Sequence, residues 1–372
     1  MARIGIDTHW LYEPASGVGQ YILGLIAGLQ SADPENDYTL WGTPTEVSAP
    51  NFRNRRFEGK YNWAWEIYWR YLKYPNADIV GPKVDLWHFT NYFVTPTKRP
   101  YVVTIYDMVH HYFPETVHGE NLKRLRKYLP SALEHAAHII AISEATKRSY
   151  VEVMGIPEEK ITVTLLAADS EFNEPASAQS RQAVRAKYAL PESYLLAVGN
   201  LEPRKNLKTL LHAYAQLKPD ERIPLVVVGG QGWLFDETKA LIGTLGLESE
   251  VIFTGYADRE ELPALYQEAT AFVYPTLYEG FGIPPLEAMA SGTPVLSSNA
   301  ASLPEVVGDA AITFDPTDQQ AMTEALRRVL SDTALRQQLA DAGQRQAAKF
   351  SWEETARQTK KVYSDALRTK NS

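Results

Sequence analysis

The chain of 372 residues has no cysteine and no long hydrophobic run. Without cysteine there is no disulfide framework, no thiolate nucleophile and no Cys-ligated metal, which is consistent with a reducing compartment. No apolar run reaches the roughly 18 residues of a transmembrane helix, and the N-terminus lacks the charged-then-apolar pattern of a signal peptide. We therefore expect a soluble, cytoplasmic protein.

An excess of positive charge is also missing. Lys and Arg number 37 against 45 Asp and Glu, which gives a net charge of −8. Nucleic acid is therefore not expected as a partner, because nothing supplies a global basic field. Apolar residues (45%) and charged residues (22%) are present in ordinary globular amounts. At about 100–200 residues per domain, the length predicts two domains, each large enough to bury a core.

Short apolar strands alternate with amphipathic helices in two series. The first series predicts a helix at Val18–Leu29 and strands at Arg3–Asp7, Tyr38–Trp41, Leu86–Phe89, Tyr101–Ile105, His138–Ile142 and Ile161–Leu165. After a linker and a short helix within Ala167–Pro191, the second series predicts strands at Tyr194–Val198, Leu225–Val228, Val251–Phe253, Ala271–Tyr274 and Pro294–Ser297. This alternation predicts an α/β fold with two doubly wound domains, each with a parallel sheet.

The domain boundaries follow from the same pattern. We expect residues 1–170 to form the first domain and residues 171–350 the second. Residues 351–372 form a last helix that no strand follows, with Ser351 as its cap, and we expect it to pack back on the first domain.

In doubly wound sheets, ligands bind outside the carboxyl ends of the strands, so unusual loops after strands are candidate binding sites. Gly17 and Gly19 follow the first strand and precede a helix. They allow close backbone approach at a helix N-terminus, which suits an anion; the alternative is a flexible loop. A dinucleotide fingerprint is absent, because the third glycine comes only at Gly24.

Gly199 opens the loop that carries Arg204 and Lys205 into the next helix. The guanidinium offers a planar fork and the ammonium a point charge, so with the helix N-terminus they would form a diphosphate site. The alternative is a solvated charged loop.

The densest segment follows the strand at Ala271–Tyr274 and contains, in order, Glu279, Gly280, Phe281, Gly282, Ile283, Pro284, Pro285, Leu286 and Glu287. The glycines free backbone N–H groups, and the prolines set a first helical turn. We expect the N–H groups of Ile283, Leu286 and Glu287 to remain available to a ligand. Each of the two glutamates can bridge a pair of sugar hydroxyls. The alternative is an ordinary helix start with acidic residues.

The loop after Ile105 offers Tyr106, Asp107, His110 and His111. Adjacent histidines are poorly spaced as ligands of one metal, and a single histidine is more often structural than catalytic. This loop is therefore a weaker candidate site than the preceding one.

Two of these segments, Glu-Pro-Arg-Lys-Asn at 202–206 and Glu-x7-Glu at 279–287, resemble those of family 4 retaining glycosyltransferases. The resemblance runs from the Ser-Gly-Val-Gly loop at 16–19 to the Phe-Ser-Trp-Glu start of the last helix at 350–353. It implies the GT-B architecture, in which two Rossmann-like domains face each other across a cleft. The N-terminal domain would bind the acceptor and the C-terminal domain the nucleotide sugar.

The resemblance also implies roles for residues. Arg204 and Lys205 would hold the donor diphosphate, Glu279 the donor sugar and Glu287 the nucleotide ribose. The implied donor-binding set is completed by Gly17, Gly19, Gly199, Gly280, Phe281, Gly282, Ile283 and Leu286. The reaction would be a front-face displacement with retained configuration, in which the cations and helix dipoles stabilise the leaving diphosphate.

Asp107 matches the acid of a His-Asp motif, but here Tyr106 stands where many relatives have the histidine. A phenol, with an ordinary pKa of about 10, is a poor proton carrier near neutral pH, so any role of that histidine is in doubt here. We assign no protein nucleophile. The chain has no Asp-x-Asp motif, which argues against the metal-dependent alternative sugar-transferase fold, and we expect no metal and no cofactor.

Basic residues interleave with Trp and Tyr from Arg53 to Tyr74, and a second basic run spans Lys123–Lys127. This composition suits an anionic membrane surface; the alternative is that the aromatic rings pack internally and the charges are solvated. With the resemblance, it suggests a polyprenyl-diphosphate-linked glycan acceptor and a peripheral site at the inner face of the plasma membrane.

A general likeness to bacterial polysaccharide mannosyltransferases suggests GDP-mannose as the donor. Three alternatives stay open. The chain could be a soluble transferase with another nucleotide sugar and a small sugar acceptor. It could be a nicotinamide oxidoreductase, which the missing fingerprint disfavours. It could also be an inactive carbohydrate-binding relative, which Tyr106 favours and the other site residues disfavour.

Overall fold

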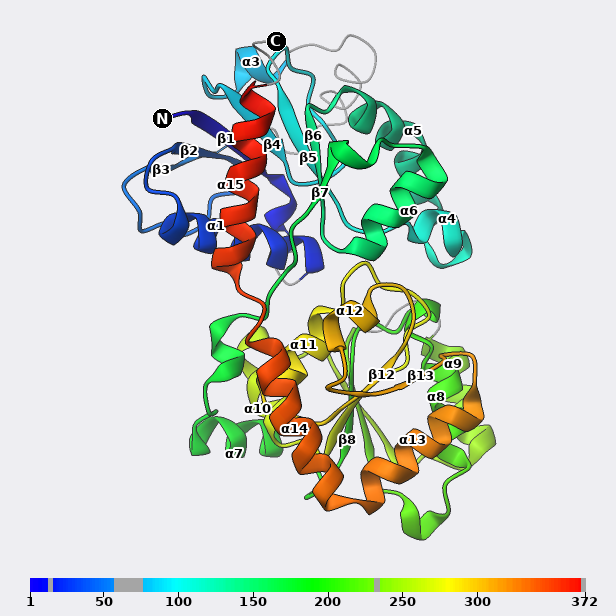
Figure 1. The fold of residues 1–372 in the computed structure, drawn as a ribbon. Coiled ribbons are helices and arrows are strands. Elements are labelled where there is room, and N and C mark those ends of the chain that lie inside the picture. Colours follow the sequence, from blue (N-terminus) through cyan, green and yellow to red (C-terminus); the bar gives the residue numbers. More distant parts are fainter. Residues whose placement is uncertain (13–15, 57–75, 231–234, 369–372) are drawn as a thin grey trace. The chain divides into compact units, whose positions relative to one another are not determined.

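The computed structural model describes residues 1–12, 16–56, 76–230 and 235–368. The chain forms two compact units, Met1–Leu166 with Ser351–Ser372, and Ala167–Phe350. Within the described residues, each unit is built on a parallel sheet with helices packed against it (Figure 1). The predicted α/β class with two doubly wound, Rossmann-like domains is confirmed.

The sheet of unit 1 has the order β3-β2-β1-β4-β5-β6-β7 among the described residues. Its strands are β1 (Arg3–Thr8), β2 (Asp37–Gly42), β3 (Phe52–Arg56), β4 (Leu86–Phe89), β5 (Tyr101–Ile105), β6 (His138–Ala141) and β7 (Ile161–Val163). Every strand predicted for this unit is present. The edge strand β3 was not predicted, because Phe52 is its one buried residue and four polar residues follow.

The sheet of unit 2 has the order β10-β9-β8-β11-β12-β13 in the part of the chain that is described. Its strands are β8 (Leu195–Val198), β9 (Leu225–Val228), β10 (Val251–Gly255), β11 (Ala271–Tyr274), β12 (Val295–Ser298) and β13 (Ile312–Phe314). The order reverses between β8 and β11, which is the switch point where doubly wound sheets bind ligands. Only the short β13 was missed.

Helices cover both sheets. Those of unit 1 are α1 (Gly17–Ala32), α3 (Ala77–Val80), α4 (Val109–Tyr112), α5 (Gly119–His135), α6 (Glu144–Met154) and α15 (Trp352–Arg368). Those of unit 2 are α7 (Ala178–Lys187), α8 (Leu207–Ala215), α9 (Phe235–Leu245), α10 (Leu262–Gln267), α11 (Ile283–Ala290), α12 (Leu303–Val307), α13 (Gln319–Ser331) and α14 (Thr333–Ala347). No helix among the described residues has the length and apolarity needed to cross a bilayer.

The last helix, α15, packs along α1 in unit 1, as predicted (Figure 1). Two glycines of α1 make this contact close. A Cβ on Gly24 would lie 2.1 Å from the Trp352 indole, and one on Gly28 would lie 2.1 Å from the Trp352 carbonyl oxygen. The Ser351 hydroxyl caps the helix by accepting the Glu354 N–H at 3.1 Å. The C-terminal segment is therefore part of the unit that begins the chain.

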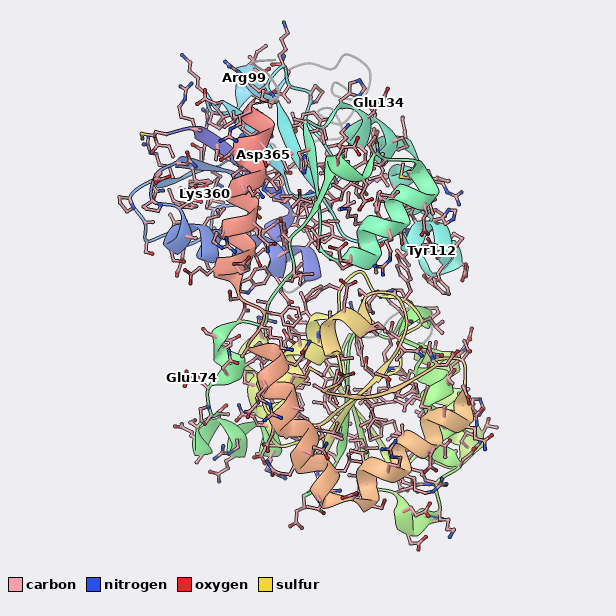
Figure 2. All side chains as sticks on the ribbon, in the orientation of Figure 1. Arg99, Tyr112, Glu134, Glu174, Lys360 and Asp365 are labelled. Carbon is pink, nitrogen blue, oxygen red and sulfur yellow. The ribbon has the colours of Figure 1, made fainter. Side chains whose placement is uncertain are left out.

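Polar contacts fix α15 further along its length. Lys360 (Figure 2) lies 3.1 Å from a carboxylate oxygen of Asp33, which is fully buried. Near the end of the helix, the Tyr363 hydroxyl lies 2.7 Å from Nδ1 of His88 on β4. Burial lowers the pKa of His88 to about 3, so this imidazole is neutral at physiological pH.

Most of the predicted aromatic and basic stretch, residues 57–75, lies outside the described residues. Arg53–Arg56 are exposed and belong to β3. The second basic run lies on α5, where Lys123, Arg126 and Lys127 are exposed.

Candidate functional site

The loop after β8 carries Arg204 and Lys205 to the switch point of unit 2. Gly199 takes a φ of +146°, and a Cβ there would come within 3.2 Å of the Lys205 side chain. The cations lie on a 3-10 turn, η5 (Pro203–Lys205). Asn206 follows and donates from its amide to the carbonyls of Pro275 (3.0 Å) and Pro316 (2.8 Å). These bonds tie the cationic loop to the loops after β11 and β13.

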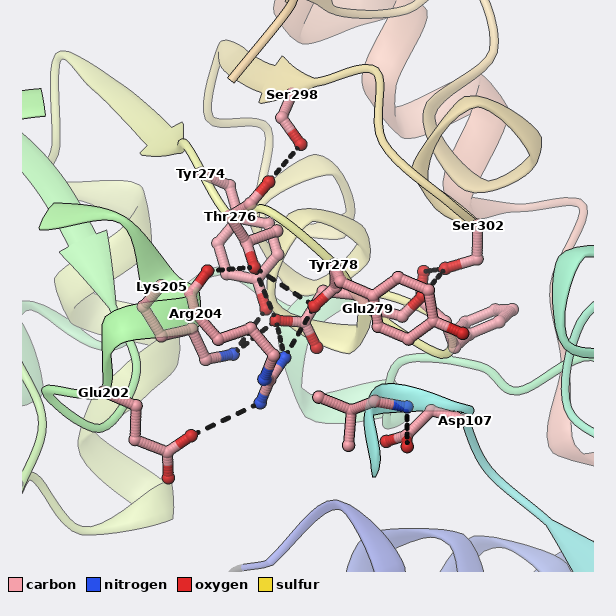
Figure 3. A network of polar contacts seen from close by, with 12 residues as sticks. Asp107, Glu202, Arg204, Lys205, Tyr274, Thr276, Tyr278, Glu279, Ser298 and Ser302 are labelled. Carbon is pink, nitrogen blue, oxygen red and sulfur yellow. Dashed lines mark hydrogen bonds and ion pairs between the residues drawn. The ribbon is translucent and has the colours of Figure 1, made fainter. Parts of the chain in front are cut away.

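Arg204, Lys205 and Glu279 form one network at this point (Figure 3). One oxygen of Glu279, Oε1, lies 2.5 Å from Nη1 of Arg204 and 2.8 Å from Nζ of Lys205. The Thr276 hydroxyl donates to the same oxygen at 3.0 Å, and Nζ of Lys205 also donates to the Tyr274 hydroxyl at 2.8 Å. The structure thus brings Glu279 to the adjacent cations Arg204 and Lys205, which lie far from it in the sequence.

The network fixes the charge of Glu279. Burial opposes ionisation of this side chain, but Arg204 and Lys205 outweigh it and hold the pKa of Glu279 at about 2. Burial also lowers the pKa of Lys205, against the attraction of Glu279. Arg204 has a second carboxylate, that of Glu202, at 3.5 Å. The cluster therefore presents positioned cationic donors, of the kind that binds a diphosphate.

Helix α11 begins where the sequence predicted it. Gly282 is the N-cap with a φ of +114°, and a Cβ there would meet the Leu303 side chain at 2.5 Å. The two prolines occupy the first turn, as predicted. The expectation that the N–H groups of Leu286 and Glu287 stay available is wrong. A helix that starts at Ile283 uses both in its internal hydrogen bonds, which leaves those of Gly282 and Ile283.

The second glutamate of the motif lies in different surroundings from the first. Glu287 is buried, with 2% of its surface exposed. Its Oε1 lies 3.0 Å from Nη1 of Arg259, and its Oε2 accepts from the Tyr266 hydroxyl at 3.1 Å. Sequence reasoning missed both partners. The available signal was weak: Arg259 is a single arginine in the loop after β10.

In unit 1, the glycines after β1 lie in the first turn of α1, where a preceding loop was expected. Ser16 is the N-cap, and its hydroxyl accepts the Gly19 N–H at 3.1 Å. No described atom outside its chain neighbours and its own helix lies within 4 Å of a Cβ placed on Gly17. Within the described part of unit 1, the N-terminal turn of α1 is therefore open at Gly17.

Tyr106 has a structural contact. Its hydroxyl donates to the Thr90 carbonyl at 2.6 Å, and burial raises the pKa of this phenol well above its ordinary value. A phenol with a raised pKa is a poor donor and acceptor of protons near neutral pH, so the doubt about a proton-carrying role at this position stays a prediction. Asp107, the next residue, accepts the Val109 N–H at 3.0 Å. His110 is buried and His111 exposed.

A second imidazole near the carboxyl edge of this sheet was not predicted. His9 follows β1, and its Nδ1 is hydrogen-bonded to the buried carboxylate of Asp7. Burial opposes protonation of His9, but Asp7 outweighs it and raises the pKa of His9. The signal in the sequence was an Asp and a His two residues apart at the end of the first strand. Among the described residues, no group of three or more Asp, Glu or His side chains is arranged to hold a metal ion.

Comparison with known proteins identifies the family. Residues 15–172 match Glycosyltransferase Family 4, and residues 180–346 match the family described as glycosyl transferases group 1. The chain is 36% identical to the O-antigen chain mannosyltransferase B of Escherichia coli, over 97% of this chain and 99% of that one. The chain belongs to glycosyltransferase family 4. It is also 37% identical to the serotype-specific mannosyltransferase WbdA of Escherichia coli, over 60% of this chain and 28% of that protein.

Solved structures show the same fold. A sucrose-phosphate synthase from Thermosynechococcus elongatus superposes with a TM-score of 0.76 at 22% identity, over 99% of this chain and 100% of that one. The Anabaena protein HepE, in complex with UDP-glucose, gives 0.74 at 19% identity, over 98% and 100%. This family 4 glycosyltransferase therefore has the predicted GT-B fold, and the oxidoreductase alternative is excluded.

Proposed function

We propose that this glycosyltransferase transfers mannose from GDP-mannose, with retained configuration, to a polyprenyl-diphosphate-linked glycan in surface polysaccharide biosynthesis. The names of the Escherichia coli relatives support mannose as the sugar and an O-antigen chain as the type of acceptor. The observation that carries the proposal is the Arg204–Lys205–Glu279 cluster at the switch point of unit 2.

The cluster supports a donor site because each group has a task in the displacement. Negative charge develops on the leaving diphosphate, and preorganised cations stabilise it without reorganising at the moment of reaction. Arg204 and Lys205 supply that charge, and the N–H groups of Gly282 and Ile283 add the N-terminus of α11. Glu279 stays ionised and orients both cations, and we assign to its second oxygen a contact with the donor sugar hydroxyls.

Substitution of Lys205 tests this assignment. Lys205→Ala should lower kcat by a factor of about 100 or more, the usual effect of losing one donor to a developing charge. The matched control is Lys208→Ala on the neighbouring helix, where Lys208 pairs with Glu237 at 2.6 Å and is half exposed. Both variants should keep the wild-type circular dichroism spectrum. Turnover in Lys205→Ala equal to that of the control would contradict the diphosphate assignment.

The identity of the nucleobase in the donor can be tested by measuring the thermal stability of the protein in the presence of GDP, UDP, ADP or dTDP. A ligand present at about 100 times its dissociation constant stabilises the folded state by roughly 2.7 kcal/mol. We expect a shift with GDP. A shift with UDP alone would favour a second candidate, a transferase of another nucleotide sugar, which the UDP-glucose complex of HepE supports.

The exposed cations of α5 support an acceptor presented on an anionic membrane. Lys123, Arg126 and Lys127 carry a local positive charge on a chain of net charge −8. Flotation with liposomes should therefore require anionic lipid, and the triple substitution of these residues by Glu should abolish it. If neither the wild type nor the triple variant floats with anionic liposomes, the proposed peripheral membrane site is refuted. The soluble transferase then remains as the alternative.

A further inference from the structure

Arg259 lies at the centre of a polar cluster in unit 2. Its Nη1 lies 3.0 Å from Oε1 of Glu287, while its Nη2 and Nε lie 2.5 and 3.0 Å from Oδ2 of Asp169. Glu171 is further away, with Oε1 at 3.6 Å from Nε. The guanidinium also stacks over the Phe172 ring, 5.0 Å from its centre. Both the edge and the face of the guanidinium are therefore held.

Three separate segments meet in this cluster. Asp169 follows the boundary between the units, which falls after Leu166. Arg259 is the first residue of η7 (Arg259–Glu261), a turn that a capping box between Asp258 and Glu261 fixes. Glu287 comes from α11, in the Glu-x7-Glu motif. The arginine fork thus links the start of unit 2 to the second glutamate of the donor motif.

The contacts of Glu287 leave it able to accept more. Each carboxylate oxygen has two lone pairs, so the carboxylate offers about four acceptor sites. Arg259 and Tyr266 fill one site on each oxygen. Because burial disfavours the charged form of a carboxylate, the nearby cation favours the ionised form of Glu287 and so the negative charge on the remaining sites.

We propose that Arg259 is a positioning residue for donor binding: it holds Glu287 ionised and in one orientation, so that the free acceptor sites of Glu287 bind the ribose hydroxyls. Asp169 in turn fixes Arg259. This inference rests on the proposed function and on the role that the family resemblance implies for Glu287, which is to bind the nucleotide ribose. Arg259 itself acts through Glu287 and requires no contact with the donor.

The first expected effect is on binding. Arg259→Gln removes the charge that orients Glu287, and a hydrogen bond to a charged group, once lost, weakens binding by about 10- to 100-fold. The KM for the donor should rise by about that factor, while kcat changes little, because the Arg204–Lys205–Glu279 cluster is untouched. Arg259→Lys keeps the charge and loses the fork, so it should recover part of the affinity.

The second expected effect is on pH dependence. Burial raises the pKa of Glu287, and Arg259 opposes that rise. Without Arg259 the carboxyl group would protonate at a higher pH, so donor KM in Arg259→Gln should climb as pH falls through a range where wild-type KM is still flat. Among the described residues, the titratable groups that act on Glu287 or on Arg259 are Asp169, Glu171, Tyr266 and Tyr274.

The deciding experiment compares GDP with 2′-deoxy-GDP by calorimetry. Wild-type protein should prefer GDP, and Arg259→Gln should lose most of that preference. The control is Arg222→Gln, which breaks a partly buried pair with Glu250 (3.2 Å) before β9 and β10, at the other end of the same sheet. It should keep the wild-type preference. A merely structural role of Arg259 would weaken both ligands equally, and that result would overturn the proposal.

The outcomes of this experiment distinguish a failure of the inference about Arg259 from a failure of the proposed function. Wild-type protein that binds neither GDP nor UDP would refute the proposed function. If the protein binds UDP and not GDP, the comparison is made between UDP and 2′-deoxy-UDP. Wild-type protein that binds its nucleotide without preferring the ribose form would refute the inference alone. If Arg259→Gln does not fold, Asp169→Asn is measured instead. We expect this variant to lose a smaller part of the preference for GDP over 2′-deoxy-GDP. An unchanged preference in Asp169→Asn would count against the proposal.

Discussion

Replacing Glu279 by Gln would leave Arg204 and Lys205 without the carboxylate oxygen that they share. The pKa of Glu279 is about 2 in the folded chain against an ordinary value of 4.5. This difference corresponds to a stabilisation of about 3 kcal/mol at neutral pH. Solvent screens it little, because only 13% of the side chain is exposed. We therefore expect Glu279→Gln to lower the free energy of unfolding by about that amount.

The stabilisation that ionised Glu279 provides should decrease as the pH falls. A carboxyl group whose pKa is depressed by folding stabilises the native state fully above the unfolded pKa, and this stability is lost as pH falls toward the folded pKa. The difference in stability between wild type and Glu279→Gln should be constant from about pH 6 to 8 and fall to about half by pH 3. Urea unfolding followed by circular dichroism at each pH measures it.

Nucleotide binding adds a second, opposite effect. With Glu279 neutral, Arg204 and Lys205 lose the anion that competes with a diphosphate for their donors. The variant should bind GDP at least as tightly as wild type, while sugar transfer falls because the carboxylate is gone. The control Glu250→Gln removes a carboxylate that is 28% exposed, from the pair with Arg222, and should cost less stability. A Glu279→Gln protein as stable as wild type at pH 7, or a difference that grows in acid, would refute the charge argument.

Two further predictions concern unit 1. Tyr106→Phe removes one hydrogen bond to the Thr90 carbonyl and should lower stability by about 1 kcal/mol, yet leave the shape of the pH–rate profile unchanged; a shifted profile would show that the phenol carries a proton. Gly28→Ala places a methyl group against the backbone of Trp352 and should destabilise by about 1–3 kcal/mol in a thermal melt. Gly17→Ala, where no such neighbour lies among the described residues, should be neutral or stabilising by up to about 1 kcal/mol; equal losses in both would contradict the packing argument for α15.

Except for the edge strands β3 and β13, the strands of both sheets were predictable because central parallel strands are buried on both faces. Their sequences are then continuous apolar runs, as in Leu225–Val228, where all four residues are buried. β3 lacks that pattern, since it lies at the edge of its sheet and only Phe52 turns inward. Its pairing with β2 is a property of the assembled sheet, which local periodicity does not encode.

The loops of the site could be predicted for a related reason. Gly199, Arg204, Lys205 and Glu279 are unusual residues placed directly after strands, so their location at the carboxyl edge follows from the strand pattern. What the sequence did not show is that one oxygen of Glu279 serves both cations. That sharing depends on side-chain directions across two loops, which spacing along the chain does not determine.

The two glutamates of the Glu-x7-Glu motif show that a sequence motif does not determine the protonation behaviour of its residues. Both carboxylates face cations, Glu287 fully and Glu279 largely buried, and yet folding moves their pKa values in opposite directions. Glu279 is held low, at about 2, by two cations, whereas burial raises the pKa of Glu287 against the single cation Arg259. The charge of Glu279 is therefore constant at any physiological pH, while that of Glu287 depends on one arginine in another loop. A relative that keeps both glutamates but lacks a cation at the position of Arg259 should accordingly bind its donor with a stronger pH dependence, which donor KM measured across pH would show.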